Sequence, residues 1–332
     1  METGRRHATG QASNRVPGLR RFGSKKAFVG QMSWNYVFVQ VMNGAVIGII
    51  YALIAVGVTL IFSILKIVNF AHGDLYMLGG YCAYYIITLL SVPPLAAMLL
   101  SMAALFVVAI VLERLLLTPL YSDATERKDE YGMIVTFGLA FFLRNSAVIL
   151  FGPFPLKPPS FIPGVQRVGN LIVTNDRLFA GGVGIVLILS LLYFLQRTIW
   201  GQALDAVSQS RESAAIVGIN ARRFNSLAFG IGAALAAGAG ALIAPIFSLA
   251  PDMGVLPNIH AYVIVILGGM GSVFGSIIAG ILLGESENLF TAFFPDPTRA
   301  LAYTNAFGLL VLMIVLTLRP QGLFGRRHLR ME

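Results

Sequence analysis

Long apolar runs alternate with short polar or proline-rich breaks along most of the chain. Most of these runs approach or exceed the roughly 20 residues with which an α-helix crosses a bilayer, whereas membrane β-strands alternate over about 10 residues. The pattern therefore predicts an all-α, polytopic membrane helix bundle. The runs are Tyr36–Phe62, Ala71–Leu90, Leu95–Leu117, Gly132–Phe151, Phe179–Leu195, Ser226–Ala250, Ala261–Phe294 and Ala300–Leu318.

The number of crossings depends on how the longest runs are divided. Ala261–Phe294 exceeds one crossing, and its glycine-rich stretch Gly268–Ser272 should split it. The charge pattern described below also requires one extra crossing or re-entrant piece, which we expect near Tyr36–Phe62. The sequence therefore predicts 8 to 10 crossings, with discontinuous helices near Asn69–Asp74 and Gly268–Ser272.

Small residues recur at four-residue spacing in two of the runs. Gly44 and Gly48 form one pair, and Gly230, Ala234 and Gly238 form a second row. Such rows allow close contact between helix backbones in lipid. The faint similarity of the two regions is a weak sign of internal duplication.

Composition places the chain in a membrane. It is 57% hydrophobic and 12% charged, against about a quarter charged in soluble domains. The net charge of +9 indicates membrane topology and contact with anionic membrane lipid, and nucleic acid is not an expected partner. Cys82 is the one cysteine, so the chain can form no intrachain disulfide.

Basic residues suggest an orientation and three regions. We expect a disordered basic tail over residues 1–33, a transmembrane domain over residues 34–320 and a basic cytoplasmic tail over residues 321–332. Both tails argue for cytoplasmic termini. Arg197–Arg223, with four arginines, is predicted to be cytoplasmic, and the proline-rich loop Gly152–Arg177 extracytoplasmic.

A polar stretch between the first two runs carries the most informative residues. Asn69, His72 and Asp74 flank Gly73 where a lipid-facing helix would carry none of them. Polar groups at membrane depth are costly unless they face protein or a water-filled cavity. One interpretation is a cavity lining. The other is a surface connection in which Asn69 and Asp74 cap helices and Lys66 pairs with Asp74.

Motifs for catalysis or metal binding are not visible. The chain has no phosphate-binding G-x-x-x-x-G-K-[ST] motif, no H-E-x-x-H and no Cys/His metal spacing. Its histidines, His7, His72, His260 and His328, are scattered. We therefore predict no catalytic residue and no metal ligand.

The stretch Gly201–Asn220 contains amphipathic helical pieces around Ala203–Ile216, and Gly218 is suited to end a helix. This stretch is either a solvated surface helix between two crossings or a docking helix that fits a cleft on a cytoplasmic partner.

Several motifs in order resemble the permease subunits of ABC importers for branched-chain amino acids. They lie in Asn43–Ala55, Asn69–Asp74, Glu212–Asn220, Leu267–Ser272 and Arg319–Arg326. The family's E-A-A-x-x-x-G coupling motif reads here as Glu212, Ser213, Ala214 and Gly218. Two departures are Asp74, where relatives often have Glu, and Asp205, where relatives commonly carry a basic residue.

The resemblance implies a transport subunit of the bacterial cytoplasmic (inner) membrane. Its implied partners are a second homologous permease subunit, two ATP-binding subunits and an extracytoplasmic substrate-binding protein. The chain itself would bind no cofactor and catalyse no reaction, because ATP-Mg belongs to the ATP-binding subunits. The implied coupling residues are Glu212, Ser213, Ala214, Gly218 and Asn220. The expected translocation pathway comprises Asn69, His72, Gly73, Asp74, Gly268, Gly269, Gly271, Ser272 and Glu287.

Other functions stay open on the residues alone. A secondary transporter would need an intramembrane relay, for which Asp74, Glu285 and Glu287 are the candidates. A channel or sensor would need a filter or an output domain, and neither is visible. Within the resembled family, the cargo could also be urea, a short amide or another small polar metabolite.

Overall fold

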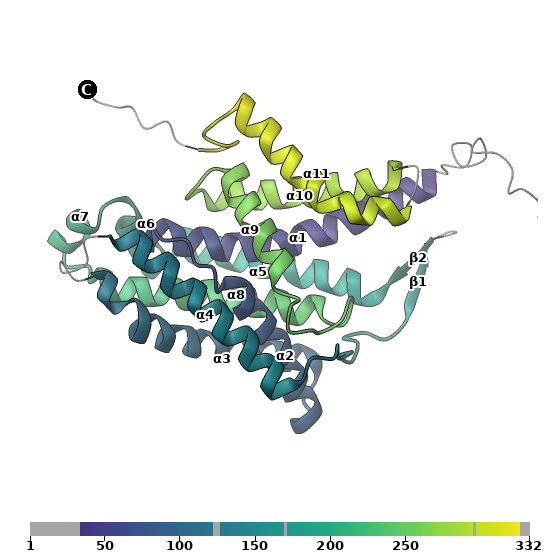
Figure 1. Cartoon of the computed structure of the whole chain (residues 1–332), viewed down its shortest axis with the longest axis horizontal. Coiled ribbons are helices and arrows are strands. Elements are labelled where there is room, and N and C mark those ends of the chain that lie inside the picture. The colour runs from purple at the N-terminus through teal and green to yellow at the C-terminus, as the bar shows by residue number, and fades with distance from the viewer. Residues whose placement is uncertain (1–33, 122–126, 169–170, 295–296, 326–332) are drawn as a thin grey trace, which may run out of the picture.

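The computed structural model describes residues 34–121, 127–168, 171–294 and 297–325 (Figure 1). It is a helix bundle with one small antiparallel hairpin, in which Val165 lies opposite Thr174. The elements are α1 (Trp34–Leu65), α2 (His72–Leu90), α3 (Pro94–Leu112), the π-helix η2 (Glu113–Leu117), the 3-10 helix η3 (Thr118–Tyr121), α4 (Lys128–Phe151), β1 (Val165–Val168), β2 (Leu171–Thr174), α5 (Asn175–Arg197), α6 (Ile199–Gln209), α7 (Arg211–Ile216), α8 (Ala221–Ile243), α9 (Val255–Gly268), α10 (Val273–Phe293) and α11 (Pro297–Leu318).

The predicted all-α membrane bundle is confirmed. Within the described residues, six helices are long and apolar enough to cross a membrane: α1, α3 with its continuation η2, α4, α5, α8 and α10. Two shorter apolar helices, α9 and the Tyr303–Leu318 part of α11, accompany them in the described part of the chain. The number of crossings, expected to be 8 to 10, stays a prediction. The chain is a multi-pass membrane protein.

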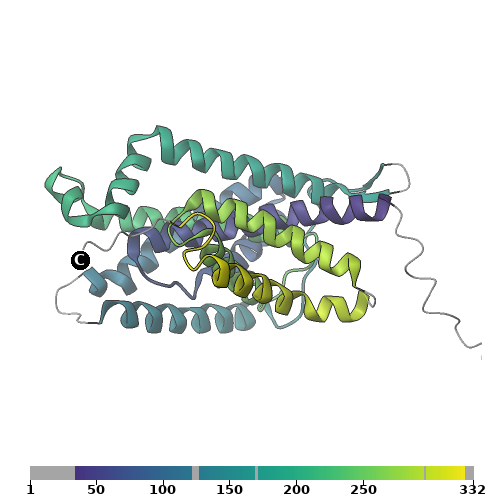
Figure 2. The same ribbon diagram turned by 90° about the horizontal axis from the view of Figure 1, so that it is seen from above.

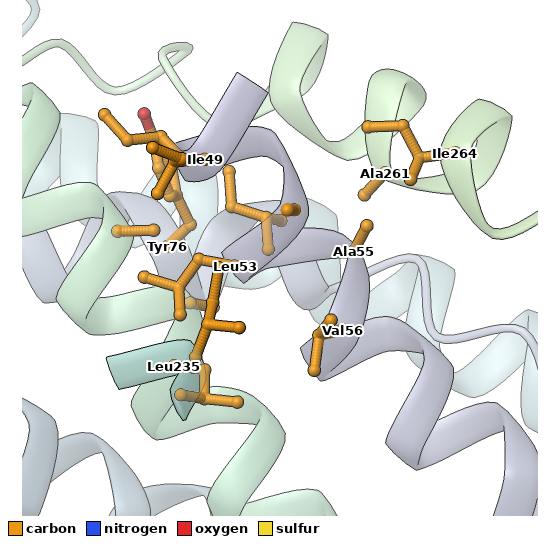
Figure 3. Packing of buried hydrophobic residues seen from close by; sticks show 14 of the residues in the cluster. Ile49, Leu53, Ala55, Val56, Tyr76, Leu235, Ala261 and Ile264 are labelled. Atoms are coloured by element: carbon orange, nitrogen blue, oxygen red, sulfur yellow. The ribbon is translucent and has the colours of Figure 1, made fainter. Parts of the chain in front are cut away.

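The core forms around α1 and α8, which are largely buried, whereas only 28% of the apolar window is buried in the α3–η2 span, in α4 and in α5. Figure 3 shows Leu53 of α1 packed with Tyr76 of α2 and Leu235 of α8. The two central helices meet at Gly57 and Gly232. A Cβ added to Gly57 would lie 2.8 Å from the carbonyl oxygen of Gly232, so only glycine permits this approach.

Two three-helix units run in opposite directions through the bundle. In the first unit, α1 is followed by a short non-helical segment and then by α2 and α3. In the second, α8, α9 and α10 follow in the same order, with α8 antiparallel to α1. Each unit packs its first helix against the third helix of the other. Gly48 of α1 contacts Gly284 of α10, and Gly230 of α8 contacts Phe106 of α3.

Three non-helical segments interrupt the bundle, and we predicted two of them. Residues 66–71 separate α1 from α2, and residues 269–272 separate α9 from α10, as expected. The third, residues 244–254, follows α8. The predicted helix Ser226–Ala250 therefore ends too late, because the chain leaves the helix at Ile243, just before Pro245.

The expectation that both termini lie on one side is wrong for the described residues. The amino-terminal end of α1 lies near the β1–β2 hairpin, at the opposite end of the molecule from α6 and α7 (Figures 1 and 2). The carboxyl end of α11 leads back toward α9, where Leu323 N–H donates to the Leu267 carbonyl.

This arrangement removes the need for a hidden crossing in the first half of the chain. The helix α1 is continuous over 32 residues, and the five helices α1 to α5 precede α6. The predicted tail 1–33 and residues 326–332 of the predicted carboxyl tail lie outside the described residues.

Candidate functional site

The predicted polar stretch is buried inside the protein. Lys66, in a left-handed conformation (φ 59°), ends α1, and the chain then turns back to begin α2 at His72. Asn69, His72 and Asp74 are each at most 1% exposed. The interpretation as a surface connection capped by Asn69 and Asp74 is therefore wrong.

The stretch packs against the beginning of α9. Gly73 and Gly254 touch through their backbones, since a Cβ added to Gly73 would lie 2.3 Å from the Gly254 carbonyl oxygen. The Asn258 amide donates to the Phe70 carbonyl at 3.0 Å, and the Tyr262 hydroxyl donates to the Asn69 carbonyl at 2.5 Å. The beginnings of two broken helices, one from each unit, therefore meet at one place.

Helix α4 holds the same stretch from its outer side. The Arg144 guanidinium contacts the Asp74 carboxylate, with Nε 3.2 Å from Oδ1. Lower on α4, the Thr136 hydroxyl donates to the Val68 carbonyl at 3.2 Å and lies 3.3 Å from the Phe70 amide. The partner of Asp74 is thus an intramembrane arginine, whereas Lys66 was the partner in the surface interpretation.

Some buried polar atoms here find no hydrogen-bond partner among the described residues. They include the Asn69 amide nitrogen and the Asn258 amide oxygen. An unsatisfied polar atom in this setting costs about 1–3 kcal/mol. A donor and an acceptor left free beside the meeting helices form a site at which a polar solute could bind.

The predicted glycine-rich stretch has other neighbours. Gly269 has a φ of 99° and lies against the backbone of Gly325, while Ser63 of α1 donates weakly to the Gly271 carbonyl at 3.4 Å. Ser272 caps α10 by accepting from the Gly275 amide, and Gly268 contacts Gly275. The structure brings this stretch to the end of α1 and the carboxyl-terminal loop, whereas the Asn69–Asp74 stretch lies against the start of α9.

Glu287 belongs to a separate buried cluster. Its carboxylate lies 3.1 Å from Nε2 of His260, and both side chains are buried. The Tyr51 ring stacks on His260 with ring centroids 4.8 Å apart. This cluster joins α1, α9 and α10 and does not contain Asp74.

The predicted coupling residues form a compact unit at one end of the molecule. Ser210 caps α7 through the Ser213 amide, and Asn220 caps α8 through the Arg222 amide. Ala214 is buried against the bundle, whereas Glu212 and Ser213 are exposed.

The outer surface of this unit is apolar where α7 ends. Ile216 is 86% exposed and Val217 is 73% exposed. Gly218, with φ 85°, then turns the chain toward α8, and a Cβ there would meet open space. Exposed apolar side chains at a loop that closes a helix are typical of a docking surface.

A direct contact links this unit to the polar stretch. The Arg211 guanidinium donates to the Ile64 carbonyl at 2.6 Å, in the last turn of α1. Burial and the charge of Arg211 lower the pKa of Lys66, two residues further on. The α6–α7 unit therefore contacts the end of α1, where the chain turns back toward Asn69.

Several residues of the site were not predicted. A charged residue within the apolar run Gly132–Phe151 was an available signal for Arg144, because intramembrane charges are usually functional or paired. Pro245 and Pro251 were available signals for the break before Gly254.

Comparison with known proteins agrees with the geometry. The family described as branched-chain amino acid transport system / permease component matches residues 40–316. The high-affinity branched-chain amino acid transport system permease protein BraD of Pseudomonas aeruginosa is 33% identical over 301 residues, which cover 86% of this chain and 95% of that protein.

Two Escherichia coli K12 permeases of the same kind also match. LivH is 32% identical over 305 residues, covering 88% of this chain and 96% of LivH. LivM is 27% identical over 311 residues, covering 84% of this chain and 68% of LivM. The chain is therefore a membrane transport subunit, not an enzyme, and it belongs to the family of permease components of branched-chain amino acid transport systems.

Proposed function

We propose that this chain is one of two permease subunits in an ABC importer that moves branched-chain amino acids across the cytoplasmic membrane. A second, similar permease, two ATP-binding subunits and an extracytoplasmic binding protein complete the assembly. The names of BraD and LivH support this cargo over urea and short amides. The similarity to LivM, a second permease name from the organism that has LivH, supports a pair of distinct permeases.

The contact between Arg211 and the Ile64 carbonyl is the observation that carries the proposed mechanism. ATP binding closes the ATP-binding subunits, and a docked α6–α7 unit moves with them. Arg211 transmits that movement to the end of α1 and hence to Lys66. A ligand can shift a conformational equilibrium only through such differential contacts.

The polar stretch and the start of α9 provide the path in this proposal. A branched-chain amino acid carries an ammonium, a carboxylate and an apolar side chain. The unpaired amide nitrogen of Asn69 can donate to the carboxylate of the amino acid, and the unpaired amide oxygen of Asn258 can accept from its ammonium. Neither contact requires a charged side chain in the path. His72 lies within the same stretch, and Gly73 leaves room for close backbone contact.

Docking is tested by replacing Ile216 with glutamine in the assembled complex. We expect Ile216→Gln to reduce recovery of the ATP-binding subunits with the permease and to lower leucine uptake, because an apolar contact is lost. Val165→Gln is the matched control, since Val165 is an exposed apolar residue in the hairpin at the opposite end. Normal assembly and uptake with Ile216→Gln would remove the α7 end from the docking surface.

A further inference from the structure

A pocket lies between the ends of two membrane helices, beside the α6–α7 unit. The first spanning segment runs from Pro94 through η2 to Leu117, and the second begins at Ala221. Their ends are joined where the Ser226 hydroxyl donates to the buried Glu113 carboxylate at 2.5 Å. A cavity of about 250 Å³ opens above this contact. Because both walls are ends of spanning helices, the cavity lies at the depth of lipid headgroups.

The charge of this pocket is unbalanced. Three arginines, Arg114, Arg222 and Arg223, line it with exposed side chains, against the single carboxylate of Glu113. Two of them occupy the first turn of α8, which has no acidic residue. Positive side chains there are unfavourable, because the helix dipole is positive at its amino-terminal end. A bound anion would relieve both the mutual repulsion and the unfavourable dipole.

The surroundings of the pocket are those of a membrane interface. Leu115, beside Arg114, is 72% exposed. Trp200 packs on Phe224, beside Arg223, with ring centroids 5.8 Å apart. Aromatic residues collect at headgroup level, and exposed leucine there meets acyl chains. These features distinguish a lipid site from a site for a small soluble anion.

We propose that this pocket binds the headgroup of an anionic phospholipid. The arginines hold the phosphate as charge-assisted hydrogen-bond donors. The acyl chains extend over Leu115.

Lipid retention by the purified full-length chain tests the proposal. Native mass spectrometry would measure binding of phosphatidylglycerol and phosphatidylcholine, with and without the ATP-binding subunits. We expect retention of phosphatidylglycerol. Each of Arg114→Gln, Arg222→Gln and Arg223→Gln should weaken it about fivefold. Arg127→Gln is the control, because Arg127 is an exposed arginine paired only with Glu130 among the contacts described for it. Thermal unfolding of each variant would verify that it folds.

Three outcomes would overturn the proposal. The first is phosphatidylglycerol binding by the triple arginine variant within twofold of the unmodified chain. The second is displacement of the lipid by millimolar inorganic phosphate, which would make this a site for a soluble anion. The third is loss of the lipid whenever the ATP-binding subunits are bound, which would make the arginines a contact for those subunits. The readout is lipid binding, so it is independent of transport activity.

Discussion

At the scale of single residues, the site depends on two glycines from opposite halves of the chain. A Cβ added to Gly254 would lie 1.9 Å from the Gly73 carbonyl oxygen, and a Cβ added to Gly73 would lie 2.3 Å from the Gly254 carbonyl oxygen. No flexible side chain can give way there, because the opposing atoms are backbone. The meeting of α2 and α9 is therefore possible only while both positions lack a side chain.

Gly73→Ala should consequently destabilise the permease by about 1–3 kcal/mol, the usual cost of overpacking a filled interior. Gly138→Ala in α4 is the matched control, since a Cβ there meets nothing within 4 Å. It should be neutral or slightly stabilising, because alanine favours helix over glycine. Thermal unfolding in detergent measures both. Equal stability of the two variants would show that the backbones can separate at little cost.

The Asp74–Arg144 pair gives a second expectation at this scale. Asp74→Asn leaves an arginine without its partner inside the membrane region, and we expect it to lower the free energy of unfolding by about 1–3 kcal/mol. This loss is smaller than for a fully buried pair, because the Arg144 side chain is 32% exposed. The double variant Asp74→Asn/Arg144→Gln removes both charges and should recover part of that loss. A double-mutant cycle on thermal stability measures the coupling. Additive effects would mean that the pair contributes nothing.

These residues show what could be predicted one position at a time. Asn69, His72 and Asp74 were identifiable because polar side chains are conspicuous in an apolar run. Their burial could not be predicted, since it depends on α9, which lies more than 180 residues later in the chain. Spacing along one helix carries no information about such distant neighbours.

At the scale of elements, the segment 244–254 is fixed by a single short bridge. Leu156 and Leu249 exchange both backbone hydrogen bonds, at 2.8 Å and 2.9 Å, so the proline-rich loop 152–163 pairs with the segment that leads to Gly254. The Lys157 ammonium also donates to the Pro245 carbonyl. A protein docked on that loop would therefore act on the start of α9.

Leu156→Cys/Leu249→Cys should form a disulfide, because residues in such a pair have Cα atoms about 5.5 Å apart, within the range that a disulfide bridges. In a Cys82→Ser background, oxidation should lower leucine uptake and reduction should restore it, provided that the segment moves during transport. Each single cysteine variant is the control. Full uptake by the crosslinked protein would show that the segment stays fixed.

Gly218 gives an expectation for the α6–α7 unit, at the end of the molecule opposite the β1–β2 hairpin (Figure 1). Its φ of 85° disfavours side chains, and asparagine tolerates this conformation far better than β-branched residues do. Gly218→Val should therefore lower uptake and recovery of the ATP-binding subunits more than Gly218→Asn. The open space at this position means that any defect comes from backbone conformation and not from a clash within the chain. Equal behaviour of the two variants would contradict this explanation.

The elements differed in how far they could be predicted. The split between α9 and α10 was visible because glycines cluster at one point. The break after Ile243 was missed because most of its flanking residues are apolar, so that hydrophobicity continues the helix past the proline signals Pro245 and Pro251. A hydrophobic run predicts that a segment lies within the membrane, but it does not predict whether the backbone of that segment is helical.

At the scale of the whole molecule, we expect the arginine-rich end that carries α6 and α7 to face the cytoplasm, by the usual distribution of basic residues. An impermeant thiol reagent applied to intact cells should label Ser160→Cys and leave Ser208→Cys unlabelled, in a Cys82→Ser background. An epitope tag placed directly before α1 should be accessible from outside. Labelling of Ser208→Cys alone would reverse this orientation.

The orientation of α1 could not be predicted from charge counts. Basic residues precede α1 as well as follow α11, and charge counts alone made the two ends equivalent. The structure separates the two ends, because α1 begins near the β1–β2 hairpin (Figure 1), whereas the chain after α11 returns to the end of α9. That placement became visible only once the helices were placed in space.

The two antiparallel three-helix units have a consequence for transport. Because α1–α3 and α8–α10 cross the membrane in opposite senses, an exchange of their conformations would interchange the two sides of the bilayer. A state open to the outside would thereby become one open to the cytoplasm, with no new type of contact. The connecting segments 66–71 and 244–254 differ in length, so the two states would differ in energy. In the proposed importer, the movement driven by ATP binding therefore needs only to reverse a preference between two related conformations.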